Sequence, residues 1–214
     1  MVRVYSIEGN IGSGKSTLLT ILKKFVPDVE NKQVICVQEP VNTWKSIQDS
    51  SGASVIERFY NDKEKYAFTF QIMACITRMT QLRNAIQNAD ENSIVICERS
   101  IFTDRHVFCE MLCKSEYINE IEIQVYTKLF EELSRDISLS GFIYLKVRPD
   151  VCLQRIMKRG REGEEGITLE YLTECDTYHN NWIRQCTLPK LTIDGNSENN
   201  QIMWVKQVTM FINP

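Results

Sequence analysis

Eight residues near the start of the chain have the spacing of a phosphate-binding loop. Residues 9–16 read GNIGSGKS, the full pattern G-x-x-x-x-G-K-[ST]. The glycines of such a loop let backbone N–H groups converge on one anion, the lysine contacts the outer phosphates, and the hydroxyl binds Mg²⁺. We therefore predict a site for ATP and Mg²⁺ that includes Gly9, Asn10, Gly12, Ser13, Gly14, Lys15, Ser16 and Thr17. The alternative is a chance glycine-rich turn, but a strand predicted at 2–7 and helical spacing at 17–24 favour the loop.

A carboxylate follows the second apolar run of the chain. Residues 33–38 predict a buried strand, and Glu39 comes directly after it, with Trp44 five residues further on. Ligands of open parallel sheets bind outside the carboxyl ends of the strands, so we expect Glu39 to lie beside the phosphates. Glu39 is therefore a candidate general base, and Trp44 offers a flat surface to a ring. The alternative interpretation of Glu39 is a solvated acid in a loop.

Charged residues are concentrated after the third apolar run. Residues 93–97 predict a strand, and Glu98 and Arg99 follow it directly, with Asp104 and Arg105 close behind. Burying so many charges is costly unless they pair with each other, a metal or a charged ligand. Glu98 could hold Mg²⁺ directly or through water, and Arg99 could bind a phosphate or its acceptor. The alternative is an internal ion-pair network, to which Asp104 and Arg105 alone could belong.

A polar stripe runs along the long helix predicted at residues 56–89. Gln71, Ala74 and Arg78 fall at i, i+3 and i+7, which places them on one face of that helix. A glutamine amide offers a donor beside an acceptor, as a nucleobase edge does, and a small neighbour leaves room for the ring. An ordinary polar helix face is the alternative.

Arginines also mark the end of a later helix. Arg155, Arg159 and Arg161 lead from the helix predicted at 149–159 into a glycine-rich loop. Such a segment suits a mobile lid, about residues 155–168, that closes guanidinium groups over a phosphoryl group. The alternative is a basic helix end that complements the helix dipole.

Strands and helices alternate along the chain and carry these residues. The strands are predicted at 2–7, 33–38, 93–97, 141–147 and 190–194, and the later helices at 116–139, 149–159 and 202–212. Residues 45–57 and 195–200 read as polar loops. We find no internal repeat and no linker, so the sequence predicts a single α/β domain over residues 1–214.

Composition excludes several partners. The formal net charge of −3 provides no basic surface for polymeric nucleic acid. No apolar run approaches the roughly 20 residues of a membrane span, and the first strand follows Met1 almost at once, which leaves no room for a signal peptide. The eight cysteines are scattered and contain no C-x-x-C pair, as is typical of reduced thiols. We therefore expect a soluble, cytoplasmic protein.

These motifs, in this order, resemble those of the deoxynucleoside kinase family over essentially the whole chain. The resemblance is carried by residues 9–16, Glu39-Pro40-Val41 with Trp44, residues 68–71, Glu98-Arg99-Ser100 with Asp104-Arg105, and residues 159–172. It implies a P-loop kinase fold, that is, a five-stranded parallel sheet flanked by helices, with an arginine-rich lid. It also implies a homodimer.

The resemblance further implies a role for each matching residue. Glu39 would take the proton of the nucleoside 5′-OH, with Arg99 and Lys15 as the other catalytic residues, and Ser16 and Glu98 would serve the metal. Arg155, Arg159 and Arg161 would be the lid arginines. The residues that would contact the deoxynucleoside are Glu39, Trp44, Tyr60, Phe70, Gln71, Ala74, Arg78, Arg99, Asp104, Phe108 and Glu164, of which Tyr60 and Glu164 would bind the sugar 3′-OH.

The implied activity is transfer of the γ-phosphate of ATP to the 5′-OH of a deoxynucleoside, as in nucleotide salvage. Arg78 and Asp104 favour deoxycytidine, deoxyadenosine and deoxyguanosine over thymidine, because a carboxylate accepts from an exocyclic amine but repels O4 of thymine. The first alternative is a nucleoside monophosphate kinase such as a thymidylate kinase. Glu39 argues against it, because an acceptor that is already a phosphate needs cations and no base. The second alternative is a regulatory nucleotide-binding module without turnover, which the intact Lys15 and Ser16 argue against.

Overall fold

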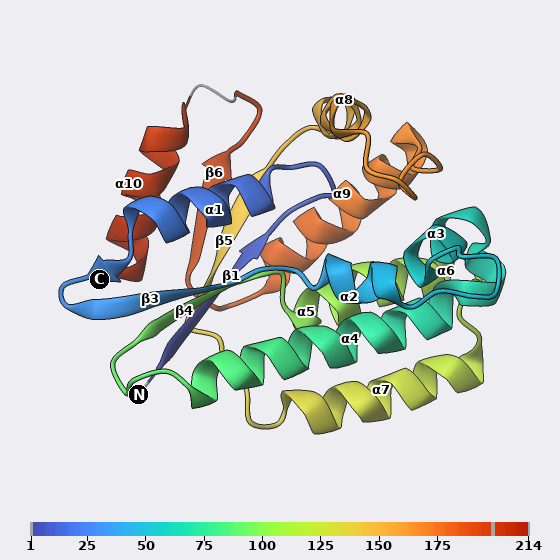
Figure 1. Cartoon of the computed structure of the whole chain (residues 1–214), viewed down its shortest axis with the longest axis horizontal. Coiled ribbons are helices and arrows are strands. Elements are labelled where there is room, and N and C mark those ends of the chain that lie inside the picture. Colours follow the sequence, from blue (N-terminus) through green and yellow to red (C-terminus); the bar gives the residue numbers. More distant parts are fainter. Residues whose placement is uncertain (1, 198–199, 214) are drawn as a thin grey trace.

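The computed structural model describes residues 2–197 and 200–213, and across these residues six strands form one sheet (Figure 1). The strands are β1 (Arg3–Glu8), β2 (Asp28–Val29), β3 (Lys32–Val37), β4 (Ile94–Glu98), β5 (Gly141–Lys146) and β6 (Lys190–Asp194). Their order is β2-β3-β4-β1-β5-β6, and each neighbouring pair is parallel except β2 with β3. The predicted α/β fold on a parallel sheet is confirmed.

The prediction of five strands is wrong, because the described residues form a sixth, short strand, β2. The chain turns back from β2 to β3 through Glu30 and Asn31, which have φ angles of 49° and 62°. Two consecutive residues at positive φ are typical of the tight turn of a two-residue hairpin. A strand of two residues is too short to show a pattern of alternating polarity, so the sequence gives no sign of it.

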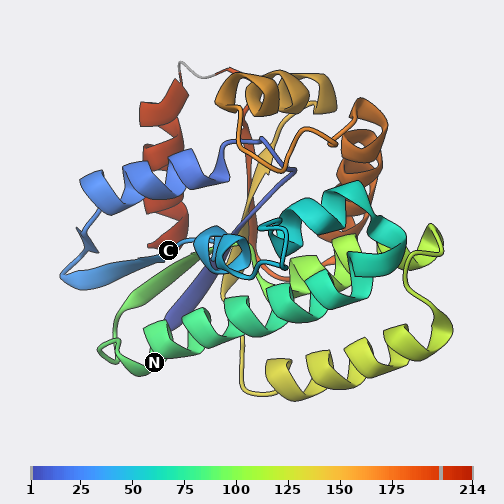
Figure 2. The ribbon, with the colours of Figure 1, turned by 45° about the vertical axis from the view of Figure 1, so that its right-hand side comes forward.

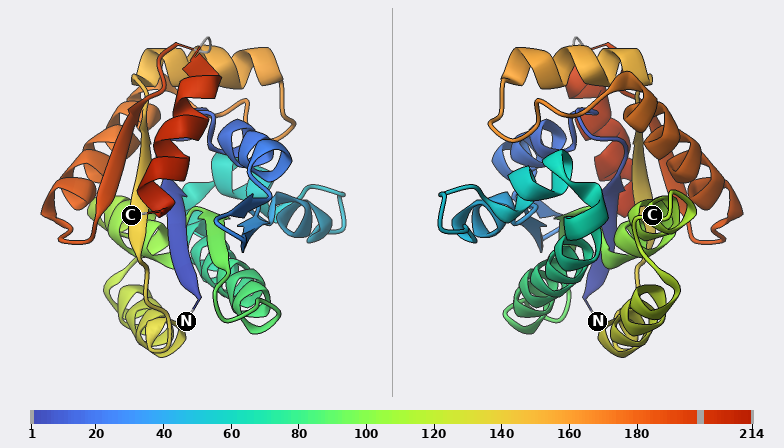
Figure 3. Two further views of the ribbon diagram at one scale, coloured as in Figure 1. Left: turned by 90° about the vertical axis from the view of Figure 1, so that its left-hand side faces the viewer. Right: turned by 90° about the vertical axis from the view of Figure 1, so that its right-hand side faces the viewer.

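Helices cover both faces of the sheet (Figure 3). Side chains alternate between the two faces along each strand, so Ile7 of β1 belongs to one core and Val4 to the other. The helices on the face of Ile7 are α1 (Lys15–Phe25), α8 (Pro149–Arg159) and α10 (Gln201–Ile212). Those on the face of Val4 are α4 (Lys63–Gln87), η1 (Asp104–Cys109), α6 (Glu110–Lys114) and α9 (Leu169–Gln185).

A further core lies between helices alone. Trp44, Phe59, Phe70 and Tyr126 are buried there, and α4 runs beside α7 (Figure 2). The other helices that contribute to this core or adjoin it are α2 (Val41–Ser46), α3 (Val55–Asn61), α5 (Ile101–Thr103) and α7 (Glu120–Ser134).

The helix predicted at 56–89 is two helices, α3 and α4, which meet at Asp62. Asp62 has φ −147° and ψ 80°, outside the helical region, and its side chain accepts a hydrogen bond from the main-chain N–H of Lys65 at 3.1 Å. The apolar pattern continues through the break because both helices bury the same side. An aspartate that caps the second helix therefore ends the first, and the periodicity does not reveal it.

Other boundaries differ where local capping decides them. The helix predicted at 116–139 begins at Glu120, because Asn119 and Glu122 form a capping box. Residues 101–114, for which we predict no element, form α5, η1 and α6, and η1 is a π-helix. In the loop predicted at 45–57, Val55 already starts α3.

The segment predicted as a lid, about residues 155–168, begins within α8. Gly160 closes α8 with a left-handed φ of 57°, and residues 160–168 connect it to α9. Of the loop predicted at 195–200, residues 198–199 lie outside the described residues. Within residues 2–197 and 200–213, none of the helices combines the length and the apolarity that crossing a membrane requires.

Candidate active site

A cavity of about 530 Å³ lies at the carboxyl ends of β1, β3 and β4, and its volume is typical of a small-molecule site. Most of the residues predicted from the sequence line it. They are Gly12, Gly14, Lys15, Ser16, Thr17, Glu39, Trp44, Tyr60, Phe70, Gln71, Ala74, Arg78, Glu98, Arg99, Asp104, Phe108, Arg155, Arg159, Arg161 and Glu164. The predicted residues that do not line it are Gly9, Asn10 and Ser13.

The phosphate loop is packed tightly against α8. Gly12 has a φ of 76°, and a Cβ atom there would lie 2.5 Å from the carbonyl oxygen of Cys152, so only glycine fits. Lys15 donates from Nζ to the carbonyl oxygen of Asn10 at 2.7 Å. Burial, and then the charge of Arg99, lowers the pKa of Lys15 to about 7. An anion bound in the loop would restore the full charge of this lysine.

The side chain of Asn10 fastens the loop to a helix. Its Nδ2 donates to the carbonyl oxygen of Leu172 in α9 at 2.8 Å, and its Oδ1 accepts from the N–H of Ile11 at 2.8 Å. The side chain of Asn10 is therefore engaged within the protein, and its predicted role in binding ATP would fall to its backbone.

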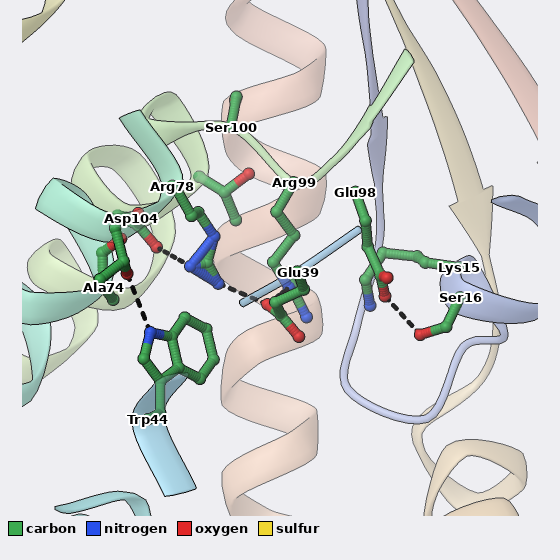
Figure 4. A network of polar contacts seen from close by, with 12 residues as sticks. Lys15, Ser16, Glu39, Trp44, Ala74, Arg78, Glu98, Arg99, Ser100 and Asp104 are labelled. Atoms are coloured by element: carbon green, nitrogen blue, oxygen red, sulfur yellow. Dashed lines mark hydrogen bonds and ion pairs between the residues drawn. The ribbon is translucent and has the colours of Figure 1, made fainter. Parts of the chain in front are cut away.

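Two oxygen-bearing side chains lie together beside the loop. Ser16 donates from Oγ to Oε1 of Glu98 at 2.5 Å (Figure 4). Glu98 is buried, and its Oε2 has no hydrogen-bond partner among the described residues. Hydroxyl and carboxylate oxygens are the ligands that Mg²⁺ takes, together with water and phosphate oxygens. This pair therefore fits a magnesium ion that arrives with a nucleotide.

Glu39 lies between two arginines (Figure 4). Its Oε1 is 2.5 Å from Nη2 of Arg78 and 3.3 Å from Nε of Arg99. Burial by itself would raise the pKa of Glu39, but Arg78, Arg99 and Lys15 outweigh it and hold this pKa below its ordinary value. Glu39 is therefore an ionised carboxylate at neutral pH.

Arg78 joins Glu39 to a second acid deeper in the cavity. Its Nη1 lies 3.3 Å from Oδ1 of Asp104, and its guanidinium lies 4.8 Å above the ring of Trp44. Burial raises the pKa of Asp104 to about 6, although Arg78 and Arg99 oppose this shift. Within the described chain, Oδ2 of Asp104 has no hydrogen-bond partner, and the same holds for Oε1 of Gln71. The cavity thus presents unsatisfied acceptors beside a cation.

Asp104 does not pair with Arg105, the alternative that the sequence left open. Arg105 points away and lies 3.3 Å from Oε1 of Glu110, a partly exposed pair. The π-helical backbone of η1 separates the two neighbours, with Asp104 buried and Arg105 partly exposed.

Aromatic rings form the apolar wall. Phe59 stacks on Phe70 with ring centroids 4.6 Å apart, and Trp44 meets the edge of Phe70 at 5.3 Å. These rings and the small Ala74 leave a flat, apolar space next to the polar groups of α4.

The three predicted lid arginines divide into two kinds. Arg159 and Arg161 both pair with the buried Glu164, at 2.6 Å and 3.2 Å. Arg155 instead donates to the main-chain oxygens of Ser13, at 3.2 Å, and Gly195, at 2.8 Å. Arg155 thus joins the phosphate loop to the segment after β6, whereas the guanidinium groups of the other two converge on Glu164.

Sequence reasoning missed one buried acid. Glu8 is fully buried and accepts hydrogen bonds from the hydroxyls of Ser6, Ser100 and Thr103. It therefore holds the turn that carries Arg99 against β1. Its position between an apolar strand and the phosphate loop gives no signal of this, because the three donors are recognisable only in three dimensions.

Further lining residues were also missed. One comes from the phosphate loop and the others from helices α2, α3, α8, α9 and α10. They are Ile11, Val41, Ile56, Phe59, Lys158, Tyr171, Gln201 and Trp204. Gln201 and Trp204 lie in α10, and the pattern of that helix indicates only a buried apolar face.

The fold and the cavity are those of a P-loop kinase, and comparison with known proteins gives the family. The model of the deoxynucleoside kinase family matches residues 5–213. Human deoxycytidine kinase is 34% identical over 92% of this chain and 85% of its own length. Deoxycytidine kinase 2 of Gallus gallus is 36% identical over 87% of this chain and 76% of its own. Mitochondrial deoxyguanosine kinase of Xenopus laevis is 30% identical over 87% of this chain and 75% of its own length. The chain therefore belongs to the deoxynucleoside kinase family, whose members are ATP-dependent phosphotransferases.

The three hydroxyl bonds of Glu8 predict a large effect on stability. Glu8→Ala should lower the free energy of unfolding by about 3 kcal/mol or more, because three buried hydroxyls lose their acceptor. Urea unfolding at neutral pH measures it. The matched control is Glu110→Ala, which removes a partly exposed pair with Arg105 and should cost less than about 1 kcal/mol. Equal losses in the two variants would contradict the anchoring role of Glu8.

Proposed function

We propose that this protein transfers the γ-phosphate of ATP, with Mg²⁺, to the 5′-hydroxyl of deoxycytidine, deoxyadenosine and deoxyguanosine in preference to thymidine. The observation that carries the proposal is the Glu39 carboxylate, which two arginines hold on the wall of the cavity that the phosphate loop also lines. A base and a phosphate site that share one cavity suit a hydroxyl acceptor.

The triphosphate would bind along the loop and the start of α1. In the described residues no side chain caps α1, and Gly14 before it is left-handed, so the N–H groups of its first turn face the cavity. Lys15 would contact the outer phosphates, and Ser16 with Glu98 would hold Mg²⁺. The metal, when bound, supplies positive charge to the phosphate oxygens and aligns the phosphoryl group for transfer.

Glu39 would accept the proton of the 5′-OH. Its lowered pKa keeps it ionised at neutral pH, so it is ready to accept. Arg99 contacts Glu39 through Nε and would offer Nη2 to the 5′-oxygen and the transferring phosphoryl group. Arg159 and Arg161 would add positive charge on the opposite side when the lid meets the phosphates, and Arg155 would support the loop from behind.

The base would lie between the aromatic wall and α4, where Trp44, Phe70 and Phe108 offer ring faces and edges. Gln71 and Asp104 carry acceptors without partners among the described residues, and cytosine and adenine offer them an exocyclic amine. Guanine offers acceptors to Arg78. Thymine would direct O4 at Asp104 and its methyl group at Arg78. The sugar 3′-OH would meet Tyr60 and Glu164, which line the cavity on the lid side.

We also propose a cytoplasmic homodimer. All cysteines of the described chain are free, which suits a reducing compartment, and cell fractionation would test the location. Apolar side chains are exposed on the neighbouring helices α4 and α7, with Ile76 at 43%, Ile121 at 73% and Val125 at 50%. Exposed apolar residues on adjacent helices favour contact with a second copy.

The role of Glu39 predicts the effect of an isosteric change. Glu39→Gln keeps the shape but removes the base, so kcat should fall by about 10²–10⁴-fold while deoxynucleoside binding changes little. Steady-state kinetics and equilibrium binding measure both. Glu110→Gln, outside the cavity, should leave kcat unchanged. A near-wild-type kcat in Glu39→Gln would remove Glu39 from the mechanism.

The Arg78–Asp104 pair predicts substrate choice and its dependence on pH. At neutral pH, kcat/KM should be about tenfold to a hundredfold lower for thymidine than for deoxycytidine, because a mismatched buried contact costs about 1–3 kcal/mol. Below pH 6, Asp104 takes up a proton because burial raises its pKa to about 6. It can then donate to O4 of thymine, so the preference for deoxycytidine should weaken as the pH falls.

The measurement is an ADP-coupled assay with all four deoxynucleosides and with thymidine monophosphate, repeated without divalent metal. Both substrates depend on Glu39 as the base, so protonation of Glu39 lowers both values of kcat/KM by the same factor. The ratio of kcat/KM for deoxycytidine to that for thymidine therefore reports Asp104 alone. In Asp104→Asn this ratio should not change with pH. Equal use of thymidine and deoxycytidine by the wild type would contradict the role of the pair, and turnover of the monophosphate alone would indicate a monophosphate kinase.

The exposed apolar residues of α7 predict the assembly state. The double change Ile121→Glu with Val125→Glu should convert the dimer to a monomer, because it places charge in an apolar contact. Sedimentation velocity measures the mass. The matched control is Ile202→Glu with Met210→Glu on α10, where both side chains are 76% exposed, and this variant should stay dimeric. A monomeric wild type would overturn the proposal.

A further inference from the structure

A buried histidine lies behind the cavity, on the far side of Arg99 from Glu39. His179 belongs to α9, is fully buried and does not line the cavity. Its Nδ1 is 2.7 Å from the carbonyl oxygen of Cys175, and its Nε2 is 3.2 Å from Nη1 of Arg99.

These two partners fix the state of the imidazole ring. A carbonyl oxygen only accepts, so Nδ1 must carry the proton, and a guanidinium only donates, so Nε2 must present its lone pair. His179 is therefore neutral. Burial, and then the charge of Arg99, holds the pKa of His179 well below its ordinary value. The ring thus offers Arg99 a permanent acceptor.

The contacts of Arg99 define both the plane and the direction of its guanidinium. One edge donates to His179 through Nη1, the Nε edge faces Oε1 of Glu39 at 3.3 Å, and the face lies 4.9 Å above the ring of Phe108. His179 is itself held, because it stacks on Tyr144 at 6.5 Å and meets Phe108 at 6.0 Å with ring planes at 87°. Tyr144, Phe108 and His179 lie in β5, η1 and α9, so regular secondary structure holds all three rings.

The backbone of Arg99 is fixed as well. It has a left-handed φ of 63°, which is uncommon outside glycine, and its N–H donates to the carbonyl oxygen of Ile7 at 3.0 Å. The long side chain nevertheless has several rotatable bonds. A fixed main chain alone does not determine where the guanidinium points.

We propose that His179 is a positioning residue that aims Arg99 at the reacting groups, a role that rests on the part of Arg99 in the proposed function. With its Nη1 held by His179, Arg99 approaches Oε1 of Glu39 through Nε, at 3.3 Å. Without that acceptor the guanidinium would turn toward Glu39 and pair with it through two N–H groups, as arginine and carboxylate commonly do. Such a pair would occupy both the base and the arginine that the transferring group needs.

The competing explanation is a core histidine that contributes only to stability, and a double-mutant cycle separates the two. His179→Phe keeps an aromatic ring between Tyr144 and Phe108 but removes the acceptor. It should lower kcat about tenfold, with little change in KM for ATP or deoxynucleoside. In the Arg99→Ala background the same change should have almost no further effect, because there is no guanidinium left to aim.

Two further variants complete the test. His179→Gln can place its amide oxygen near the position of Nε2, so it should retain most of the wild-type kcat. Tyr144 stacks on His179 and donates from its hydroxyl to Oδ1 of Asn180 at 3.1 Å. Tyr144→Phe removes this hydrogen bond but keeps the ring and leaves the contacts of Arg99 intact, so it should leave kcat unchanged. Thermal unfolding of every variant shows whether it is folded, and if His179→Phe does not fold, His179→Leu, which also lacks the acceptor, takes its place in the cycle.

The outcomes distinguish this proposal from the proposed function. A loss of kcat that is equal in the wild-type and Arg99→Ala backgrounds would overturn the positioning role and leave the function standing. An Arg99→Ala variant with normal kcat would overturn the part of Arg99 in the mechanism and the positioning role together.

Discussion

Glu39, Arg78, Arg99 and Asp104 are withdrawn from water together, and each is tolerable there only because the others are present. Burial opposes the charges of Glu39, Arg78 and Asp104. Removing Arg78 would leave the buried Asp104 without its ion-pair partner, at a cost of about 3–5 kcal/mol. They come from the end of β3, from α4, from the end of β4 and from η1. The same ion pairs that form the site therefore also fix these four segments relative to one another.

The sequence predicts the elements that repeat a regular pattern over several turns or residues. Helix α8 and strand β6 have the predicted bounds, and the five parallel strands lie within two residues of them. The sequence pattern does not predict structure that depends on a single local interaction. The strand β2 depends on a two-residue turn, and the break at Asp62 depends on one capping carboxylate. Both are invisible to periodicity because neither changes which side is apolar.

The same distinction holds within the candidate site. Glu39, Glu98 and Arg99 can be found from the sequence because they directly follow strands that end at one edge of the sheet. Glu8 and His179 cannot, because spacing along the chain carries no information about what packs behind an arginine or beneath a turn. Arg155 has helical spacing with Arg159, yet its guanidinium turns to main-chain oxygens. Position on a helix face does not determine the partner of a long side chain.

The pairing of Glu164 with Arg159 and Arg161 has a thermodynamic consequence. A phosphate that reaches these arginines exchanges one anion for another, and the net gain in free energy is smaller than that from meeting an unpaired cation. In the proposed function, a phosphate that binds these arginines would displace Glu164, and the change in free energy for this exchange would be small in either direction. In the proposed function, Glu164 would therefore compete with the phosphates for these arginines and lower the net affinity of the site for either nucleotide.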